Sequence, residues 1–289
     1  MKRVEPTATL ARRFWAAIEP IHAIVYFARE PVEAARRIGL RGFWMGYFAG
    51  RVAPMGSVPA EAVVAMAYGF APAMVKRAIP DAWTFADPTA VVSARITSAG
   101  QALRHHLASS ELTNLAELSG LLWTAVEACR FDGRPLAAAW SQVPRPVDAV
   151  ESTWLAATIL REHRGDGHVL AGVGAGLRGL DATVSFVATR AISRELIQPS
   201  RGWSDEDWEQ SARQLQARGL IDSYGRLTKT GGTLRREIED LTDRLASAPV
   251  ERLGETGVGQ AITLATPLSR RLIDTGVIPV PNPIGAPRP

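Results

Sequence analysis

Residues 204–246 read SDEDWEQSARQLQARGLIDSYGRLTKTGGTLRREIEDLTDRLA, and this stretch indicates the fold more clearly than any other part of the chain. Ser204 is a favourable N-cap, and three acidic residues follow it where the helix dipole favours anions. Apolar residues then recur at helical spacing from Trp208 to Leu215. The stretch therefore predicts a helix that begins after Ser204 and ends at Gly219.

A short β-hairpin is predicted directly after this helix. Residues 220–222 have the pattern of a strand, residues 223–225 that of a tight turn, and residues 226–229 that of the returning strand. Residues 230–232 contain two glycines that interrupt the pattern, and a long helix is expected from about Thr233. A helix, a hairpin and a long helix in this order predict a winged helix, in which the hairpin is the wing.

These motifs resemble a known group of regulators. The GL pair at 219–220, the LTKTGG at 227–232 and the helix after them are similar to the winged-helix regulators of the MarR-like group. Together with REHRGDGH at 161–168 and SRGWSDEDW at 200–208, they resemble an uncharacterised bacterial helix-turn-helix family. The resemblance to the MarR-like group implies a transcriptional regulator that binds duplex DNA as a homodimer. An aromatic segment in the N-terminal half, described below, suggests in addition that it responds to a small-molecule effector.

Basic residues near the expected recognition helix are the candidates for contacts to DNA phosphates, which position a protein on the duplex without specifying sequence. The recognition helix itself begins with three acids, whereas a helix that enters the major groove normally presents basic and amide groups early. These acids oppose DNA binding, so a scaffold that no longer reads DNA remains the alternative. The predicted DNA contacts are Arg194, Arg201, Arg213, Arg218, Arg226 and Lys229.

The segment 161–168 gathers six ionisable side chains around two glycines. The glycines predict that a helix ends near Gly165 and that Asp166 caps the next helix. A chain that folds back at the glycines would instead bring His163 and His168 together. With Asp166 they would then form a site for zinc or iron, because neutral imidazole and carboxylate suit such ions.

Two segments of the N-terminal half are suited to a ligand pocket, with core packing as the alternative for both. His22 and Tyr26 are four residues apart, so they share a helix face and could contact a ligand or a haem. Residues 41–56, RGFWMGYFAGRVAPMG, alternate aromatics with glycines between two arginines, which suits an aromatic wall with a cationic rim. The predicted ligand contacts are His22, Tyr26, Arg41, Trp44, Tyr47, Arg51, His163 and His168.

Helical periodicity dominates the rest of the chain, so the predicted fold is all-α with a small β-wing. The motif GLRG occurs at 39–42 and at 176–179, which leaves open two tandem helical or winged-helix domains. The predicted segments are an N-terminal helical domain at 1–132, either ligand-sensing or a degenerate repeat, a proline-containing linker at 133–150, a winged-helix domain at 151–249, and a helix with a proline-rich strap at 250–289.

The composition of the chain limits which classes of protein remain possible. The chain has 289 residues, of which 46% are hydrophobic, and this is enough for real cores. Its single cysteine, Cys129, excludes a disulfide framework and a cysteine-based zinc cluster within one chain. The formal net charge of +4 permits a polyanionic partner without requiring one.

Membrane, secretory and catalytic patterns are not found. No stretch approaches the roughly 18 apolar residues of a membrane span, so we expect a cytoplasmic protein with no membrane partner. No nucleophile elbow, metalloprotease or phosphate-loop motif occurs, so we expect no catalytic residue and no cofactor. The alternative is a scaffold that binds a small molecule, a metal ion or haem, with or without enzymatic activity, through His22, His163, His168 and residues 41–56.

Overall fold

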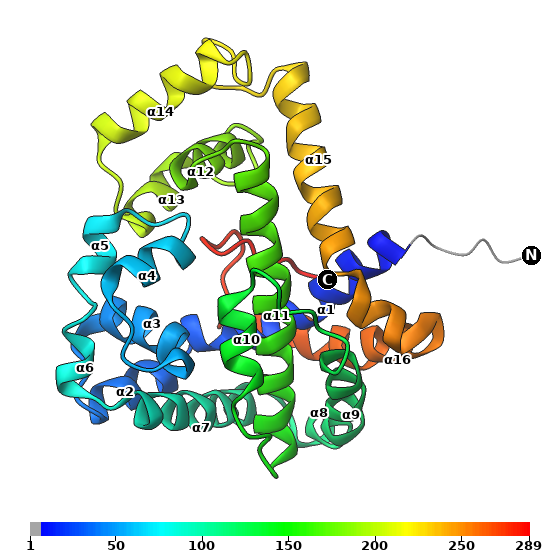
Figure 1. Ribbon diagram of the computed structural model, residues 1–289. Coiled ribbons are helices and arrows are strands. Elements are labelled where there is room, and N and C mark those ends of the chain that lie inside the picture. Colours follow the sequence, from blue (N-terminus) through cyan, green and yellow to red (C-terminus); the bar gives the residue numbers. More distant parts are fainter. Residues whose placement is uncertain (1–6) are drawn as a thin grey trace, which may run out of the picture.

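The computed structural model describes residues 7–289, which form sixteen α-helices and two 3-10 helices and contain no β-strand (Figure 1). No helix among these residues is both long and apolar enough to cross a bilayer. In chain order the elements are α1 (Thr7–Ala23), η1 (Ile24–Tyr26), α2 (Arg29–Arg37), α3 (Gly42–Val52), η2 (Ala53–Met55), α4 (Ala60–Met66), α5 (Pro72–Lys76), α6 (Ala82–Phe85), α7 (Pro88–His106), α8 (Ser109–Leu112), α9 (Leu115–Val126), α10 (Pro135–Ser141), α11 (Ala149–Gly174), α12 (Gly179–Val187), α13 (Arg194–Arg201), α14 (Asp205–Ala217), α15 (Lys229–Leu245) and α16 (Ser247–Asp274).

The larger apolar core surrounds α11, the long central helix of Figure 1. Helix α11 packs against α1, α7, α9 and α10, and α16 returns from the C-terminal half to pack along α1. Trp140 of α10 and Trp154 of α11 are fully buried there, with their rings 5.8 Å apart. Residues of the predicted linker at 133–150 therefore contribute to this core.

A second, smaller core lies between α12, α13, α14 and α15. Its buried side chains include Trp208 and Leu215 of α14 and Ile238 of α15. In Figure 1, α14 and α15 form an arch above α12 and α13. The two cores meet near the C-terminal end of α11, where Ala171 belongs to the second core.

Helix α11 runs through both glycines of the 161–168 segment, so the helix end predicted there is wrong. Asp166 does not cap a following helix, because its Oδ2 accepts hydrogen bonds from the amides of Leu136 and Ala137, at 3.0 Å each, at the start of α10. A Cβ atom on Gly167 would lie 3.4 Å from the Cβ of Leu245. Close packing against α10 and α15 thus outweighs the roughly 1 kcal/mol that a glycine costs inside a helix.

The predicted β-wing is also wrong. The turn after α14 is held by a single antiparallel bridge between Ile221 and Leu227, which is too short to form a strand. Thr228, expected in the returning strand, is instead the N-cap of α15, where its Oγ1 accepts the amide of Gly231 at 3.1 Å. Helix α15 begins at Lys229, so it takes up the residues that a second strand would need.

Helices α13 and α14 are joined by a short turn at residues 202–204. Gly202 has a φ of 74°, the left-handed conformation that commonly ends a helix. Ser204 is the N-cap of α14, as predicted, and its Oγ accepts the amide of Asp207 at 3.1 Å. Two helices joined by such a turn and packed over Leu215 form a helix-turn-helix arrangement.

The residues after α16 cross the molecule without forming a helix and pass beside α12 (Figure 1, red). Asn282 is buried and holds this strap in shape. Its Nδ2 donates to the carbonyls of Pro279 and Ala286, at 3.0 and 2.9 Å, and its Oδ1 accepts the amide of Ala286. The strap is therefore an ordered part of the fold.

Helix α12 begins in close contact with the segment between α4 and α5. A Cβ atom on Gly179 would lie 1.5 Å from the carbonyl oxygen of Tyr68, so only glycine fits there. The hydroxyl of Tyr68 donates to the carbonyl of Leu177 at 2.6 Å. This contact joins the second core to the N-terminal half of the chain.

We expect Gly179→Ala to lower the free energy of unfolding by about 2 kcal/mol or more, because the added methyl must displace either α12 or the Tyr68 segment. Urea denaturation measures this change. Gly120→Ala in α9 is the matched control, since a Cβ atom there meets nothing within 4 Å, and it should leave stability equal or raise it by up to about 1 kcal/mol. Equal loss of stability in both variants would show that the close approach is not required.

Candidate functional site

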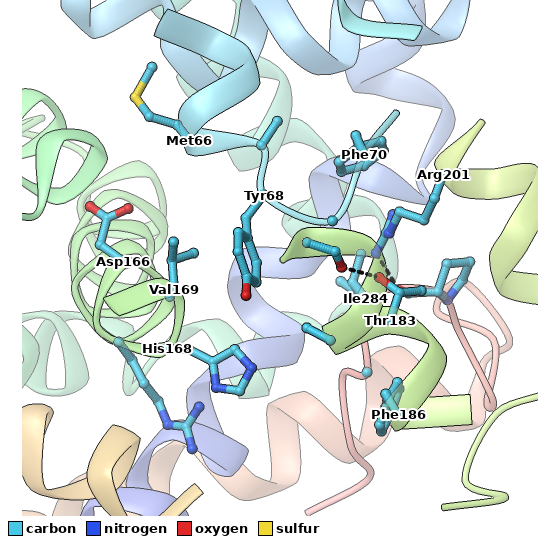
Figure 2. A pocket seen from close by; sticks show the side chains of 18 of the residues that line it. Met66, Tyr68, Phe70, Asp166, His168, Val169, Thr183, Phe186, Arg201 and Ile284 are labelled. Carbon is cyan, nitrogen blue, oxygen red and sulfur yellow. Dashed lines mark hydrogen bonds between the residues drawn. The ribbon is translucent and has the colours of Figure 1, made fainter. Parts of the chain in front are cut away.

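A cavity of about 340 Å³ lies between α11, α12 and residues 66–70, and strap residues 283–285 form part of its wall (Figure 2). Helices α1, α3, α13 and α15 contribute further side chains. The volume is within the range of about 300–1,000 Å³ that is usual for small-molecule sites. Both cores and the strap therefore meet around one space.

Aromatic and apolar side chains form much of this wall. Figure 2 shows Tyr68 and Phe70 approaching from the segment before α5, with Phe186 on α12 and Ile284 on the strap. Tyr68 and His168 project toward the same part of the cavity. Burial raises the pKa of Tyr68 to about 12, so its phenol is neutral.

The polar part of the wall contains more cations than anions. Arginine is the residue best suited to bind planar anions, because its guanidinium presents several donors in a fixed plane. Five arginines and three carboxylates line the cavity, namely Arg51, Arg161, Arg164, Arg201 and Arg235, and Glu19, Asp166 and Glu239.

Arg51 and Arg161 are neutralised by buried carboxylates. Glu162 lies 2.9 Å from Arg51 Nη2 and 2.9 Å from Arg161 Nη1, and Arg161 Nε lies 3.5 Å from Glu19. Burial alone would raise the pKa of Glu162, but the two guanidiniums hold it well below its usual range. This part of the wall is balanced in charge and is held by the fold itself.

The hydrogen-bond donors of Arg164 and Arg235 are only partly satisfied. Arg164 Nη2 lies 2.8 Å from Asp243, and Arg235 Nη2 lies 3.4 Å from Glu239. The Nε atoms of both arginines are buried, and neither has a hydrogen-bond partner among the described residues. A buried donor without a partner costs about 1–3 kcal/mol, so this part of the wall is less well satisfied than the part around Glu162.

Arg201, the last residue of α13, has no carboxylate partner in the described part of the chain. Its Nη2 donates to the carbonyl of Pro283 at 2.6 Å, and its guanidinium lies 4.3 Å from the centre of the Phe70 ring. Burial lowers the pKa of Arg201, and the charges of Arg51 and Arg161 act in the same direction. The cavity wall therefore carries a cation without a carboxylate partner, Arg201, next to an aromatic surface.

His168 supplies a neutral imidazole. Its Nδ1 lies 3.0 Å from the hydroxyl of Thr242, which donates its own proton to the carbonyl of Ile238 at 2.7 Å. Nδ1 must then carry the proton and donate, which leaves Nε2 as an acceptor. Burial lowers the pKa of His168, and it raises the pKa of nearby Asp166 to about 6.

The structure places three of the predicted ligand contacts, Tyr47, Arg51 and His168, in the wall of this cavity. His22 and Tyr26 lie elsewhere, in the larger apolar core around α11. His22 Nδ1 is 2.9 Å from the hydroxyl of Thr158 and its Nε2 is 3.2 Å from that of Tyr26. Burial keeps the pKa of His22 well below its ordinary value, so this is a neutral interior network.

Arg41 and Trp44 also lie outside the cavity wall. The guanidinium of Arg41 stacks over the ring of Phe85 at 4.0 Å. Trp44 packs on Tyr47 and Phe70, with ring centres 5.5 and 5.9 Å apart. Trp44 therefore supports the aromatic wall from behind, whereas Arg41 contacts a residue outside it.

His163 makes a separate buried contact. Its Nε2 accepts the amide of Arg130 at 3.3 Å and a guanidinium N–H of Arg134. Burial and the Arg134 charge lower the pKa of His163 to about 3, so the ring is neutral. His163, His168 and Asp166 have three different sets of partners, and the structure does not bring them together as metal ligands.

The predicted DNA contacts fall into two groups. Arg194 lies 2.9 Å from Asp205 and 2.6 Å from Glu209, while Arg201 points into the cavity and Arg218 Nη1 donates to the carbonyl of Gly176 at 2.9 Å. The others are exposed, with Arg213 on α14, Arg226 on the turn after it and Lys229 at the start of α15.

The acidic residues at the start of α14 form their contacts within the α13–α14 motif itself. Arg194 of α13 neutralises Asp205 and Glu209, and Asp207 accepts the hydroxyl of Ser204 at 2.6 Å. These acids therefore hold α13 and α14 together and satisfy the first turn of α14. Glu206 is the remaining exposed acid in that turn.

Sequence reasoning missed several cavity residues. Tyr68 and Phe70 flank a glycine between two short helices, and an aromatic pair in such a loop could have drawn attention to them. Arg164 belongs to the segment 161–168, but its role there was not evident without knowing that α11 is continuous. No local signal marks Arg235, because it faces the cavity from a distant helix.

Comparison with known protein families identifies the family of this chain. A sequence profile described as a helix-turn-helix family matches residues 11–279. The chain belongs to this helix-turn-helix family. No curated protein and no solved structure shows significant similarity to it. The match agrees with the α13–α14 arrangement and carries no information on the MarR-like group.

We expect stability to fall in acid because His163 is buried as a neutral ring. The unfolded chain takes up a proton as the pH falls below about 6.5, whereas the folded chain does so only near pH 3. The stability contributed by this group is thus complete above about pH 6.5 and is lost as the pH falls, by roughly 2 kcal/mol between pH 7 and pH 5.

His163→Gln tests this, since the amide oxygen can replace Nε2 as an acceptor but does not titrate. Urea denaturation at the two pH values should show a loss that is smaller by roughly 2 kcal/mol in the variant than in the wild-type protein. An identical pH dependence in both proteins would mean that His163 is not the group responsible.

Proposed function

We propose that this helix-turn-helix protein binds a small organic anion with an aromatic or apolar body, and that it is ligand-responsive through its helix-turn-helix motif. The observation that carries the proposal is the uncompensated charge of Arg201 in the cavity wall, since this residue has no carboxylate partner among the described residues. Arg164 and Arg235 lie in the same wall, and each is only partly satisfied by its carboxylate partner. A carboxylate or sulfonate would accept from the guanidinium N–H groups that face the cavity.

The apolar part of the wall supports a ligand with an aromatic or apolar body. Phe70 and Phe186 each lie under an arginine of the wall, at 4.3 Å from Arg201 and 5.6 Å from Arg235. An aromatic body could lie against these rings while its anionic group meets the guanidiniums. His168 Nε2 would accept a hydrogen bond from a hydroxyl or amide of the ligand.

The path from the cavity to the helix-turn-helix is short. The Trp203 indole N–H, in the turn between α13 and α14, donates to the carbonyl of Gly69 at 2.9 Å. The amide of Ala71 donates to the carbonyl of Arg201 at 2.8 Å. Residues 67–71 thus contact both the cavity and the turn, so a ligand that moves this segment would also move the motif.

Ligand binding is tested with a panel of arenecarboxylates and arenesulfonates, each compared with its neutral amide by isothermal titration calorimetry. We expect 1-naphthoate or another panel member to bind at least about tenfold more tightly than its amide, because the guanidiniums recognise the charge. Arg201→Met and Arg235→Met should each weaken the anion by about tenfold or more.

Arg218→Met is the matched control, since Arg218 lies on the helix-turn-helix but outside the cavity wall, and it should leave the affinity unchanged. Binding of anions and amides with equal affinity, or equal weakening by Arg218→Met, would contradict the proposal. Failure of the entire panel to bind would contradict it as well.

Duplex DNA is a second candidate partner, and the exposed face of α14 favours it. This face presents Gln210, Arg213 and Gln214, which are side-chain types that read base edges. Arg226 lies on the turn beyond and Lys229 begins α15, and both are basic residues of the type that contacts phosphates. Helix-turn-helix proteins usually bind as dimers, so a homodimer and a role in transcription belong to this candidate.

We expect weak, salt-sensitive binding of duplex DNA that is lost at high salt and reduced by the double variant Arg226→Ala with Lys229→Ala. Glu206→Gln should increase the affinity, because it removes the negative charge of an exposed acid in the first turn of α14. Fluorescence anisotropy at several salt concentrations measures both effects. No binding at low salt, or no change in either variant, would exclude this face of α14 as a DNA-binding surface.

A further inference from the structure

Helices α2 and α7 bring together three side chains that have no part in the cavity. Glu30 of α2 faces His105 and His106 at the end of α7, and one potential ligand atom from each lies within 4.8 Å of the others. His105 Nδ1 is 2.6 Å from Glu30 Oε1, and the two imidazole rings stack with centres 4.6 Å apart. Among the described residues this is the only such group of three.

The carboxylate of Glu30 is incompletely satisfied. Its Oε2 is buried and has no hydrogen-bond partner within residues 7–289, although Oε1 is contacted by His105 and lies 3.6 Å from the exposed Arg29 Nε. A buried carboxylate oxygen without a donor is unfavourable, because it has lost its water without replacement. A bound cation is one way to satisfy it.

We propose that Glu30, His105 and His106 bind a divalent transition-metal ion of the Zn²⁺ class. Two imidazoles and one carboxylate form a ligand set that zinc accepts with a fourth, open position, whereas Ca²⁺ and Mg²⁺ prefer oxygen ligands alone. His105 is half exposed, so an ion can enter from solvent, and small rotations of the surface rings close the ligand distances. The ion replaces the direct contact between His105 and Glu30 and joins α2 to α7.

The test is a titration of the full chain with ZnCl₂ after treatment with EDTA, followed by calorimetry. We expect one saturable site. His106→Ala and Glu30→Gln should each weaken it by about tenfold or more. Glu33→Gln, which changes an exposed acid on the same helix, is the matched control and should leave the affinity unchanged.

Two further readouts separate a built site from scattered surface binding. Co²⁺ should give the visible absorption of a low-coordinate site in the wild-type protein and in Glu33→Gln, but not in His106→Ala. Zn²⁺ should raise the melting temperature of the wild-type protein and not that of the correctly folded His106→Ala variant. No saturable binding, or equal binding in all variants, would overturn the proposal, and neither result would bear on the anion cavity.

Discussion

A single buried carboxylate determines how the elements around the cavity can assemble. Glu162 is only 1% exposed in the middle of α11, and it remains ionised because Arg51 of α3 and Arg161 of α11 contact it directly. Removal of one partner from such a group typically costs about 3–5 kcal/mol, so α3 and α11 are held in one relative position. Glu19 extends the same network to α1. The cavity is built on this balanced set of charges.

Because the charges of that network balance one another, the binding properties of the cavity depend on the remaining arginines of its wall. Arg201 lies at the end of α13, beyond the reach of these carboxylates, and its position is fixed by the strap carbonyl of Pro283 and the ring of Phe70. The same segment that supplies Phe70 also binds the turn between α13 and α14 through Gly69. Arg201 and the helix-turn-helix are therefore linked over a few residues, which is why we propose that ligand binding acts on the motif.

Local signals in the sequence predicted local structure well. Ser204 specifies the start of α14 by itself, and the predicted N-cap was confirmed. Tyr47 and Arg51 could be selected as candidates because aromatics, glycines and arginines alternate there. The continuity of α11 through Gly167 could not be predicted, since it depends on packing against distant helices. Thr228 was compatible with a strand or with an N-cap, and the tertiary position of α15 decided between them.

Contacts between residues that meet only in the folded chain could not be predicted from the sequence. Arg235 and Tyr68 are far apart in sequence, and both line one cavity. We propose that a ligand in this cavity acts on the helix-turn-helix through residues 67–71. Hydrogen exchange of the full chain, measured with and without the tightest-binding aromatic acid, tests this coupling. We expect slower exchange in residues 67–71 and also in the turn at 202–204. Slower exchange confined to α11 and α12, with the turn unchanged, would contradict it.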